Sequence, residues 1–161
     1  MIALADSNAW ILAPEAELDY FDVQSLHLCR EVTPLAAWNV MVEDPQPLLA
    51  VAFWVRDRVS VLFGVKPIGG FSGTAVQAVS AGDRLDFFLV EHVDNESLVL
   101  TARDRHLDVM TCISMAGPQI SVTSSVRVHN GFGHAYMLPV GIAHRWIVRG
   151  MLKRLQAKLL E

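Results

Sequence analysis

The chain is poor in several features that define particular classes of protein. It contains only two cysteines among its 161 residues, Cys29 and Cys112, and neither belongs to a C-x-x-C pattern. A disulfide framework is therefore not indicated, and we expect two buried free thiols in a reducing cytoplasm. The metal-binding pattern H-E-x-x-H is absent as well. We accordingly predict no metal and no cofactor.

Long apolar runs and an excess of positive charge are also missing. The longest dense apolar run, residues 48–55, is followed at once by the charged residues 56–58, so no membrane span is predicted. A net charge of −4 argues against a nucleic-acid-binding protein. The N-terminus lacks the positive start and apolar core of a signal peptide, and we therefore expect a cytoplasmic protein.

Apolar residues are abundant, at 52% of the chain. A chain of this length suits one domain and has enough apolar surface to offset the entropy cost of folding. The apolar content is higher than a domain this small needs for its core. An internal apolar cavity and a homodimer interface would each account for the excess.

Hydrophobic periodicity divides the chain into an acidic N-terminal arm, residues 1–18, and a single domain, residues 19–161. Thr33 and Pro34 together form a helix start, with a capping hydroxyl followed by proline at the first helical position. The predicted elements are a strand at 20–30, helices at 33–43 and 48–63, a glycine-rich loop at 64–83 with a short strand near 75–79, strands at 86–93, 97–103, 106–116 and 119–130, and a helix at 139–161.

The last predicted helix is amphipathic. Its apolar residues recur at helical spacing, and its basic residues fill the other face. The apolar stripe comprises Ile142, Trp146, Ile147, Met151, Leu155 and Leu159; the basic face comprises Arg145, Arg149, Lys153, Arg154 and Lys158. A long helix that follows several antiparallel strands indicates an α+β fold in which a curved sheet closes over the helix. Such a fold often leaves a cavity between the two.

The segment 104–108, DRHLD, is the most suggestive cluster of polar residues. In a strand, His106 and Asp108 would point to the same face, where a carboxylate beside an imidazole can form a general base or a ligand site. A cross-strand polar network from Asp108 to Arg127 or His129 is the plainer alternative. His144 is the other acid–base candidate. Near a helix start a neutral imidazole is favoured, and it either lines a cavity mouth or only packs.

Several aromatic residues are candidates for an apolar ligand site, namely Trp54, Phe71, Tyr136 and Trp146. Phe71 lies in the glycine-rich segment 69–73, which suits an apolar lip over a cavity. The alternatives are that these side chains fill the core and that the loop is a plain connector. The glycine-rich segment lacks the ending of a phosphate-binding loop.

Four segments carry a family resemblance: TPLAAWNVMVED, FWVRDRVSVLFGVK, TARDRHLDVMTCIS and VRVHNGFGHAYMLPVGIAHRWIVRGMLKR. Over residues 20–158 the chain resembles a bacterial family of domains of unknown function that occurs alone or fused behind NAD-binding domains of the short-chain dehydrogenase type. Its element order is similar to the helix-grip fold of START lipid-transfer domains, polyketide cyclases and birch-pollen-allergen-like proteins (the SRPBCC group). The resemblance implies a helix-grip fold. It implies no activity, because the family has none assigned.

Three functional hypotheses follow. The first is a module that binds a small hydrophobic or amphipathic molecule between the sheet and the last helix. The second is an enzyme of the cyclase, hydratase or isomerase type that uses His106, Asp108 or His144 as acid or base. The third is a non-catalytic interaction domain that forms a homodimer through its surplus apolar surface.

Overall fold

The computed structural model describes residues 1–5, 7–43 and 69–161. The predicted helix at 48–63 and the candidate Trp54 lie outside the described residues. In chain order the described elements are β1 (Ile2–Ala3), β2 (Trp10–Ile11), a short 3-10 turn (Glu15–Glu17), β3 (Tyr20–His27), α1 (Pro34–Val42), β4 (Arg84–Leu85), β5 (Phe88–Val93), β6 (Ser97–Arg103), β7 (Leu107–Ala116), β8 (Gln119–Val128) and α3 (Gly131–Leu160).

Six strands form one antiparallel sheet in the order β3-β8-β7-β6-β5-β4. The turns predicted between strands are present. Asp94 closes the β5–β6 turn because its Oδ1 accepts hydrogen bonds from the backbone N–H groups of Glu96 and Ser97, at 2.8 and 2.7 Å. Gly117 closes the β7–β8 turn at φ +58°, a left-handed conformation that glycine adopts without a steric penalty. No strand forms at 75–79, and β4 pairs with β5 instead.

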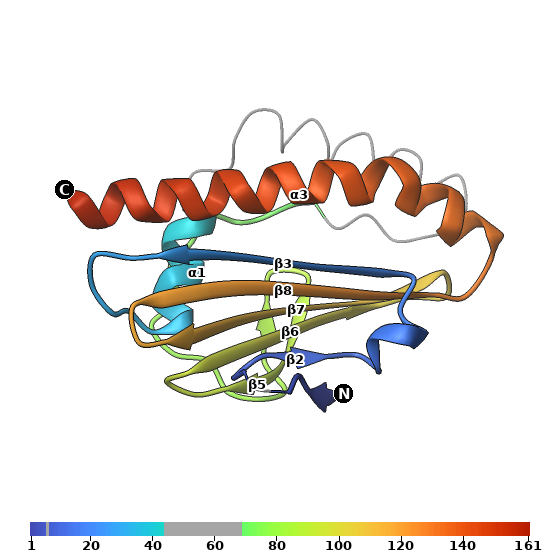
Figure 1. The fold of residues 1–161 in the computed structure, drawn as a ribbon, viewed down its shortest axis with the longest axis horizontal. Helices are drawn as coiled ribbons and strands as arrows, with labels where there is room; N and C mark the ends of the chain where they lie inside the picture. Colours follow the sequence, from blue (N-terminus) through green and yellow to red (C-terminus); the bar gives the residue numbers. More distant parts are fainter. Residues whose placement is uncertain (6, 44–68) are drawn as a thin grey trace.

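The helices of the described residues, α1 (Pro34–Val42) and α3, lie on one face of the sheet (Figure 1). α1 begins as predicted, since the Thr33 hydroxyl accepts a hydrogen bond from the N–H of Ala36 at 3.2 Å. α3 crosses the sheet beside β3 and packs against α1. The described chain is therefore an α+β domain with a mostly antiparallel sheet and a long C-terminal helix.

α3 begins at Gly131 rather than at Pro139. Asn130 is its N-terminal cap, because the side-chain oxygen accepts a hydrogen bond from the N–H of Gly133 at 3.0 Å. Pro139 lies inside the helix. The sequence analysis took Pro139 as the first helical residue, whereas the capping asparagine lies upstream and starts the helix.

The buried stripe of α3 agrees with the prediction only in part. Met151, Leu155 and Leu159 pack in the core as predicted, and Val148 and Leu152 are buried there as well. Ile142 and Trp146, which the sequence analysis placed in the buried stripe, are 66% and 73% exposed. The reason is geometric. Leu152 and Leu155 set the rotation of the helix, and this rotation turns Ile142 and Trp146 away from the sheet.

The N-terminal arm covers the opposite face of the sheet. β1 pairs with β2, and Ala9 packs into a second small core with Val99, Met110 and Cys112. Burial raises the pKa of the Cys112 thiol to about 11, so this thiol stays protonated near neutral pH. Cys29, expected to be buried, is exposed and lies beyond the end of β3. In the described part of the chain, no helix is both long and apolar enough to cross a membrane.

Candidate functional site

A cavity of about 1120 Å³ lies between α3 and the sheet. The wall from α3 consists of side chains three or four residues apart, which places them on one face of the helix. They are Phe132, Tyr136, Val140, Ala143, Ile147 and Met151. The wall from β7 comprises Leu107, Val109, Thr111 and Ile113, and that from β8 comprises Val122, Ser124 and Val126. The four β7 residues are every second residue of the strand, as strand alternation requires. The walls from these elements are thus mostly apolar, with the hydroxyl groups of Thr111 and Ser124 on β7 and β8.

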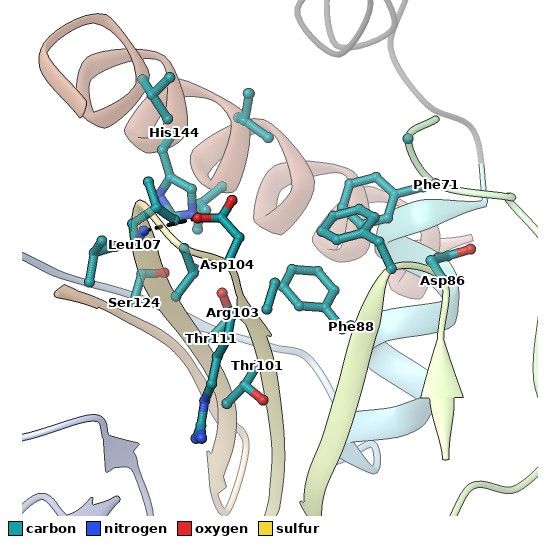
Figure 2. A pocket seen from close by; sticks show the side chains of 18 of the residues that line it. Phe71, Asp86, Phe88, Thr101, Arg103, Asp104, Leu107, Thr111, Ser124 and His144 are labelled. Atoms are coloured by element: carbon teal, nitrogen blue, oxygen red, sulfur yellow. Dashed lines mark hydrogen bonds between the residues drawn. The ribbon is translucent and has the colours of Figure 1, made fainter. Parts of the chain in front are cut away.

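One end of the cavity, here called the aromatic end, is formed by Trp38, Phe71, Phe87 and Phe88 (Figure 2). The Trp38 ring lies 5.3 Å from that of Phe71 and 5.8 Å from that of Phe88, both in edge-to-face contact. Phe71 also lies 5.4 Å from Phe87. Aromatic contacts of this kind stabilise a packed apolar surface without fixing it by hydrogen bonds.

Asp86 positions the segment that carries Phe71. Its Oδ1 accepts a hydrogen bond from the N–H of Ser72 at 2.9 Å. Asp86 also has a φ of +55°, a left-handed conformation that is uncommon outside glycine and that aspartate tolerates better than most residues. Figure 2 shows Asp86 beside Phe71 at this end of the cavity.

The other end, here called the histidine end, is lined by Asp104, Arg105 and His106, and Asn130 supports it from behind. Asp104 folds the turn between β6 and β7, because its Oδ1 accepts hydrogen bonds from the backbone N–H groups of His106 at 2.7 Å and of Leu107 at 3.0 Å. This arrangement is an Asx turn. Since β7 begins only at Leu107, the direction of the His106 side chain is set by the turn and not by strand alternation.

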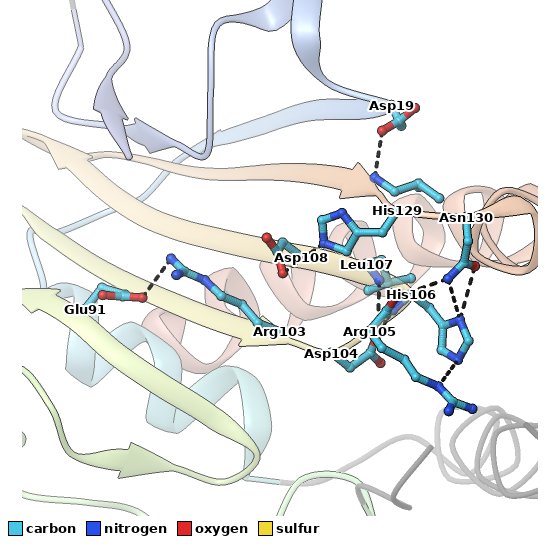
Figure 3. A network of polar contacts seen from close by, with 11 residues as sticks. Asp19, Glu91, Arg103, Asp104, Arg105, His106, Leu107, Asp108, His129 and Asn130 are labelled. Carbon is cyan, nitrogen blue, oxygen red and sulfur yellow. Dashed lines mark hydrogen bonds and ion pairs between the residues drawn. The ribbon is translucent and has the colours of Figure 1, made fainter. Parts of the chain in front are cut away.

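His106 is held on both sides by polar partners (Figure 3). Arg105 donates from Nε to Nε2 of His106 at 2.9 Å, so Nε2 acts as the acceptor. Nδ1 of His106 lies 3.1 Å from Oδ1 and 2.9 Å from Nδ2 of Asn130, whose Oδ1 also caps α3. The amide nitrogen of Asn130 donates to the Arg105 carbonyl at 3.1 Å as well. Because Nε2 accepts from Arg105, Nδ1 is the nitrogen left to donate, and Oδ1 of Asn130 is the acceptor within its reach.

Gly133 brings the start of α3 against this turn. A Cβ atom at position 133 would lie 2.6 Å from the backbone oxygen of His106 and 2.6 Å from a methyl carbon of Val128. Both distances are shorter than any side-chain carbon accepts, and one of the atoms belongs to the backbone. Only glycine therefore permits the close approach that joins α3 to the His106 turn.

His144 enters the cavity from α3 (Figure 2). Its ring makes an edge-to-face contact with Tyr20 at 6.0 Å. Its Nδ1 is buried and has no hydrogen-bond partner among the described residues. Burial lowers the pKa of His144, an effect that the charge of Asp22 partly offsets. His144 is thus a neutral histidine with a hydrogen-bonding atom left unused beside the cavity.

The structure separates the two members of the DRHLD pair. His106 is buried and lines the cavity, whereas Asp108 does not line it and lies 3.3 Å from Nε2 of His129. The expectation that His106 and Asp108 share one strand face is wrong, because the Asx turn places His106 before β7. The alternative of a polar contact across strands from Asp108 is confirmed for His129, and Figure 3 shows the two side chains side by side.

Of the four residues predicted to contact a ligand, Phe71 and Tyr136 line the cavity, at opposite ends. Trp146 is exposed and is not among the lining residues, and Trp54 lies outside the described residues. Sequence reasoning did not select Asn130, although an asparagine three residues before a helical N–H is a recognisable cap signal. Among the described residues, no three His, Cys, Asp or Glu side chains gather where they could hold a metal ion.

Comparison with protein families gives one finding. The model of the family described as "Protein of unknown function (DUF2867)" matches residues 15–151. The match includes both ends of the cavity and most of α3. Searches of the curated proteins and of the solved structures gave no significant match.

Proposed function

Because the chain belongs to this family of unknown function, we propose its function from the cavity: it binds a small hydrophobic or amphipathic molecule between the sheet and α3. The observation that carries the proposal is a cavity of about 1120 Å³ with apolar walls and a few convergent polar groups. Ligand sites in proteins generally have this composition, and their volumes are roughly 300–1,000 Å³.

The lining of the cavity suggests how such a molecule would lie. The rings of the aromatic end offer apolar surface, which suits the hydrophobic body of the ligand. On the α3 wall, Nδ1 of His144 is buried without a partner among the described residues, and a buried polar atom in that state costs roughly 1–3 kcal/mol. A ligand hydroxyl, carboxyl or amide group that hydrogen-bonds this nitrogen would remove the cost. We therefore place the polar group of the ligand beside His144.

The finer fold and location assignments belong to the same proposal. A long C-terminal helix lying over an antiparallel sheet supports a helix-grip fold of the START and polyketide-cyclase type. Cytoplasmic location stays a prediction from the sequence. A shared fold does not establish a shared ligand, so the proposal depends on the cavity alone.

The direct test fills the cavity. Val109 lines it from β7, and Val109→Trp would occupy much of the space that a ligand needs. Val23→Trp is the matched control, because Val23 is 44% exposed and makes no part of the cavity. With the amphipathic fluorescent probe anilinonaphthalene sulfonate, we expect saturable 1:1 binding to the wild type and to Val23→Trp, and a loss of at least tenfold in Val109→Trp. Equal binding by all three proteins would refute the proposal.

A second candidate function is an enzyme of the cyclase, hydratase or isomerase type, with His144 as the acid–base group. The observation that favours it is a neutral imidazole facing the cavity with one nitrogen free to exchange a proton. His106 suits this role less well, because Arg105 and Asn130 already occupy its two nitrogens.

The two functions differ in what His144→Gln does. A binding module would keep ligand in this variant with a several-fold weaker affinity. An enzyme would lose at least a hundredfold in turnover, the usual contribution of a positioned acid or base. Small-molecule extracts incubated with wild type and with His144→Gln, then compared by mass spectrometry, separate the two. Identical extracts after both incubations would remove the enzyme from consideration.

A further inference from the structure

The outer face of α3 carries an exposed apolar stripe. Leu138, Ile142 and Trp146 are 74%, 66% and 73% exposed, although large apolar side chains usually avoid water. They follow one another at intervals of four residues, so they lie along a single face of the helix. This face points away from the cavity, which is lined by the neighbouring stripe that includes Ala143 and Ile147.

The same face is positively charged. α3 contains five Lys and Arg residues and no Asp or Glu, in a chain whose net charge is −4. Arg149 and Lys153 are exposed, lie one helical turn apart and follow directly after Trp146 along the stripe. Neither has an ion-pair partner among the described residues, whereas Arg145 pairs with Asp22 and Lys158 pairs with Glu43. The outer face of α3 thus combines apolar side chains with two available positive charges.

We propose that this face docks on the surface of an anionic phospholipid membrane. A helix that lies in a membrane interface presents Trp and Leu to the acyl boundary and Lys or Arg to the headgroups, as this face does. Tryptophan is favoured at the boundary between headgroups and hydrocarbon. Each Lys or Arg near an anionic surface contributes roughly 1 kcal/mol of attraction, so Arg149 and Lys153 select acidic lipid.

Charge argues against a second copy of the chain as the occupant. A symmetric dimer places the same surface of both subunits together. On this face it would bring Arg149 and Lys153 of one subunit against those of the other, and α3 offers no carboxylate to compensate. An anionic lipid surface satisfies both the apolar stripe and the charges.

Docking would place the cavity next to the membrane. One face of α3 lines the cavity and another carries the stripe. In a docked protein, the cavity and the membrane surface would therefore be separated by about the diameter of the helix, roughly 10 Å. The inference goes beyond ligand binding and does not depend on it, because the stripe is exposed whether or not the cavity is filled. Vesicle binding and probe binding are therefore measured separately.

The test is co-sedimentation of the whole protein with vesicles of phosphatidylcholine alone and with 30% phosphatidylglycerol. We expect binding only to the acidic vesicles, and weaker binding as salt is raised. The double variant R149Q/K153Q is expected to bind them roughly thirty-fold more weakly, at about fivefold for each charge. R30Q/R127Q is the matched control, because it removes two exposed charges elsewhere and is expected to bind like the wild type.

A spectroscopic measurement tests the apolar part of the stripe. Trp146 fluorescence is expected to shift to shorter wavelength on acidic vesicles, and W146F is expected to lack that shift while keeping the wild-type circular dichroism. The proposal is overturned if both vesicles bind equally, if R149Q/K153Q binds as tightly as R30Q/R127Q, or if W146F shows the same shift as the wild type. A stable dimer by light scattering that W146F abolishes, without vesicle binding, would also overturn it and identify a second copy as the occupant.

Discussion

The two ends of the cavity are built by different forces. At the histidine end, short segments around Asp104 and Asn130 are joined by directional hydrogen bonds of 2.7–3.1 Å. At the aromatic end, rings from three separate segments meet through apolar contact. Hydrogen bonds fix position and direction, whereas apolar contacts fix volume and adapt to shape. In the proposed binding site, the histidine end is therefore the more rigid wall, and the aromatic end sets the size of the ligand.

The largest change expected at the histidine end comes from Gly133→Ala. The new methyl group would meet the His106 carbonyl oxygen at 2.6 Å, and neither backbone segment can move freely. Overpacking of this kind costs about 3 kcal/mol of the free energy of unfolding, measurable by urea denaturation. Gly131→Ala is the control, since no atom lies within 4 Å of its added carbon. A Gly133→Ala protein as stable as Gly131→Ala would show that the close approach is not required.

Asn130→Ala is expected to have the next largest effect. It removes the cap of α3 together with a hydrogen-bond partner of His106, and loss of a cap costs about 1–2 kcal/mol. Asn130→Asp separates the two roles. The aspartate carboxylate can still accept a hydrogen bond from the N–H of Gly133 but cannot donate to the Arg105 carbonyl. We therefore expect Asn130→Asp to recover about half of the stability that Asn130→Ala loses. If Asp restored nothing, the cap would not be the source of the stability.

His144 makes the stability of the folded chain depend on pH. Burial lowers its folded pKa below the ordinary value of 6.5, so the unfolded chain binds a proton more readily. The free energy of unfolding should then fall as pH drops below about 6.5, with a slope no steeper than about 1.4 kcal/mol per pH unit for one proton. Above that range the contribution is flat. The free energy of unfolding of His144→Gln, measured by denaturation at several pH values, should depend less steeply on pH than that of the wild type. An unchanged pH dependence would contradict its assignment to His144.

Asp108→Asn is expected to have the smallest effect. Asp108 lies outside the cavity, and its ion pair with the partly exposed His129 contributes at most about 0.5 kcal/mol. Binding of anilinonaphthalene sulfonate should be unchanged, whereas the same probe should respond to Phe71→Ala at the aromatic end. A loss of probe binding in Asp108→Asn would mean that the cavity extends to the other face of the sheet.

The sequence predicts the parts of the molecule that depend on local periodicity. The Thr33 cap and the turns that separate the predicted strands, at Asp94 and Gly117, are all present as expected. The position of His106 was not predictable from strand alternation. Asp104 forms a turn by accepting hydrogen bonds from the N–H groups of His106 and Leu107, so His106 lies in the turn and β7 starts only at Leu107. An aspartate whose side chain can bond the backbone N–H two residues later is a local sequence signal. Interpreting Asp104 in DRHL as the start of an Asx turn would have placed His106 correctly.

The remaining errors come from contacts between distant segments. The rotation of α3 depends on how Leu152 and Leu155 meet α1, so periodicity alone assigned Trp146 to the buried side of the helix. The aromatic end joins Trp38 to Phe71 and Phe88, and no short pattern links these positions. Whether the chain binds a ligand is equally a property of the assembled cavity and not of any motif.

Native mass spectrometry of the protein purified from cells, followed by organic extraction, tests the central claim most directly. The account predicts a 1:1 complex with a small hydrophobic or amphipathic molecule that organic solvent releases, and its absence from Val109→Trp but not from Val23→Trp. A wild-type protein that carries only its own mass, and that still gains no partner after incubation with a cell lipid extract, would contradict it.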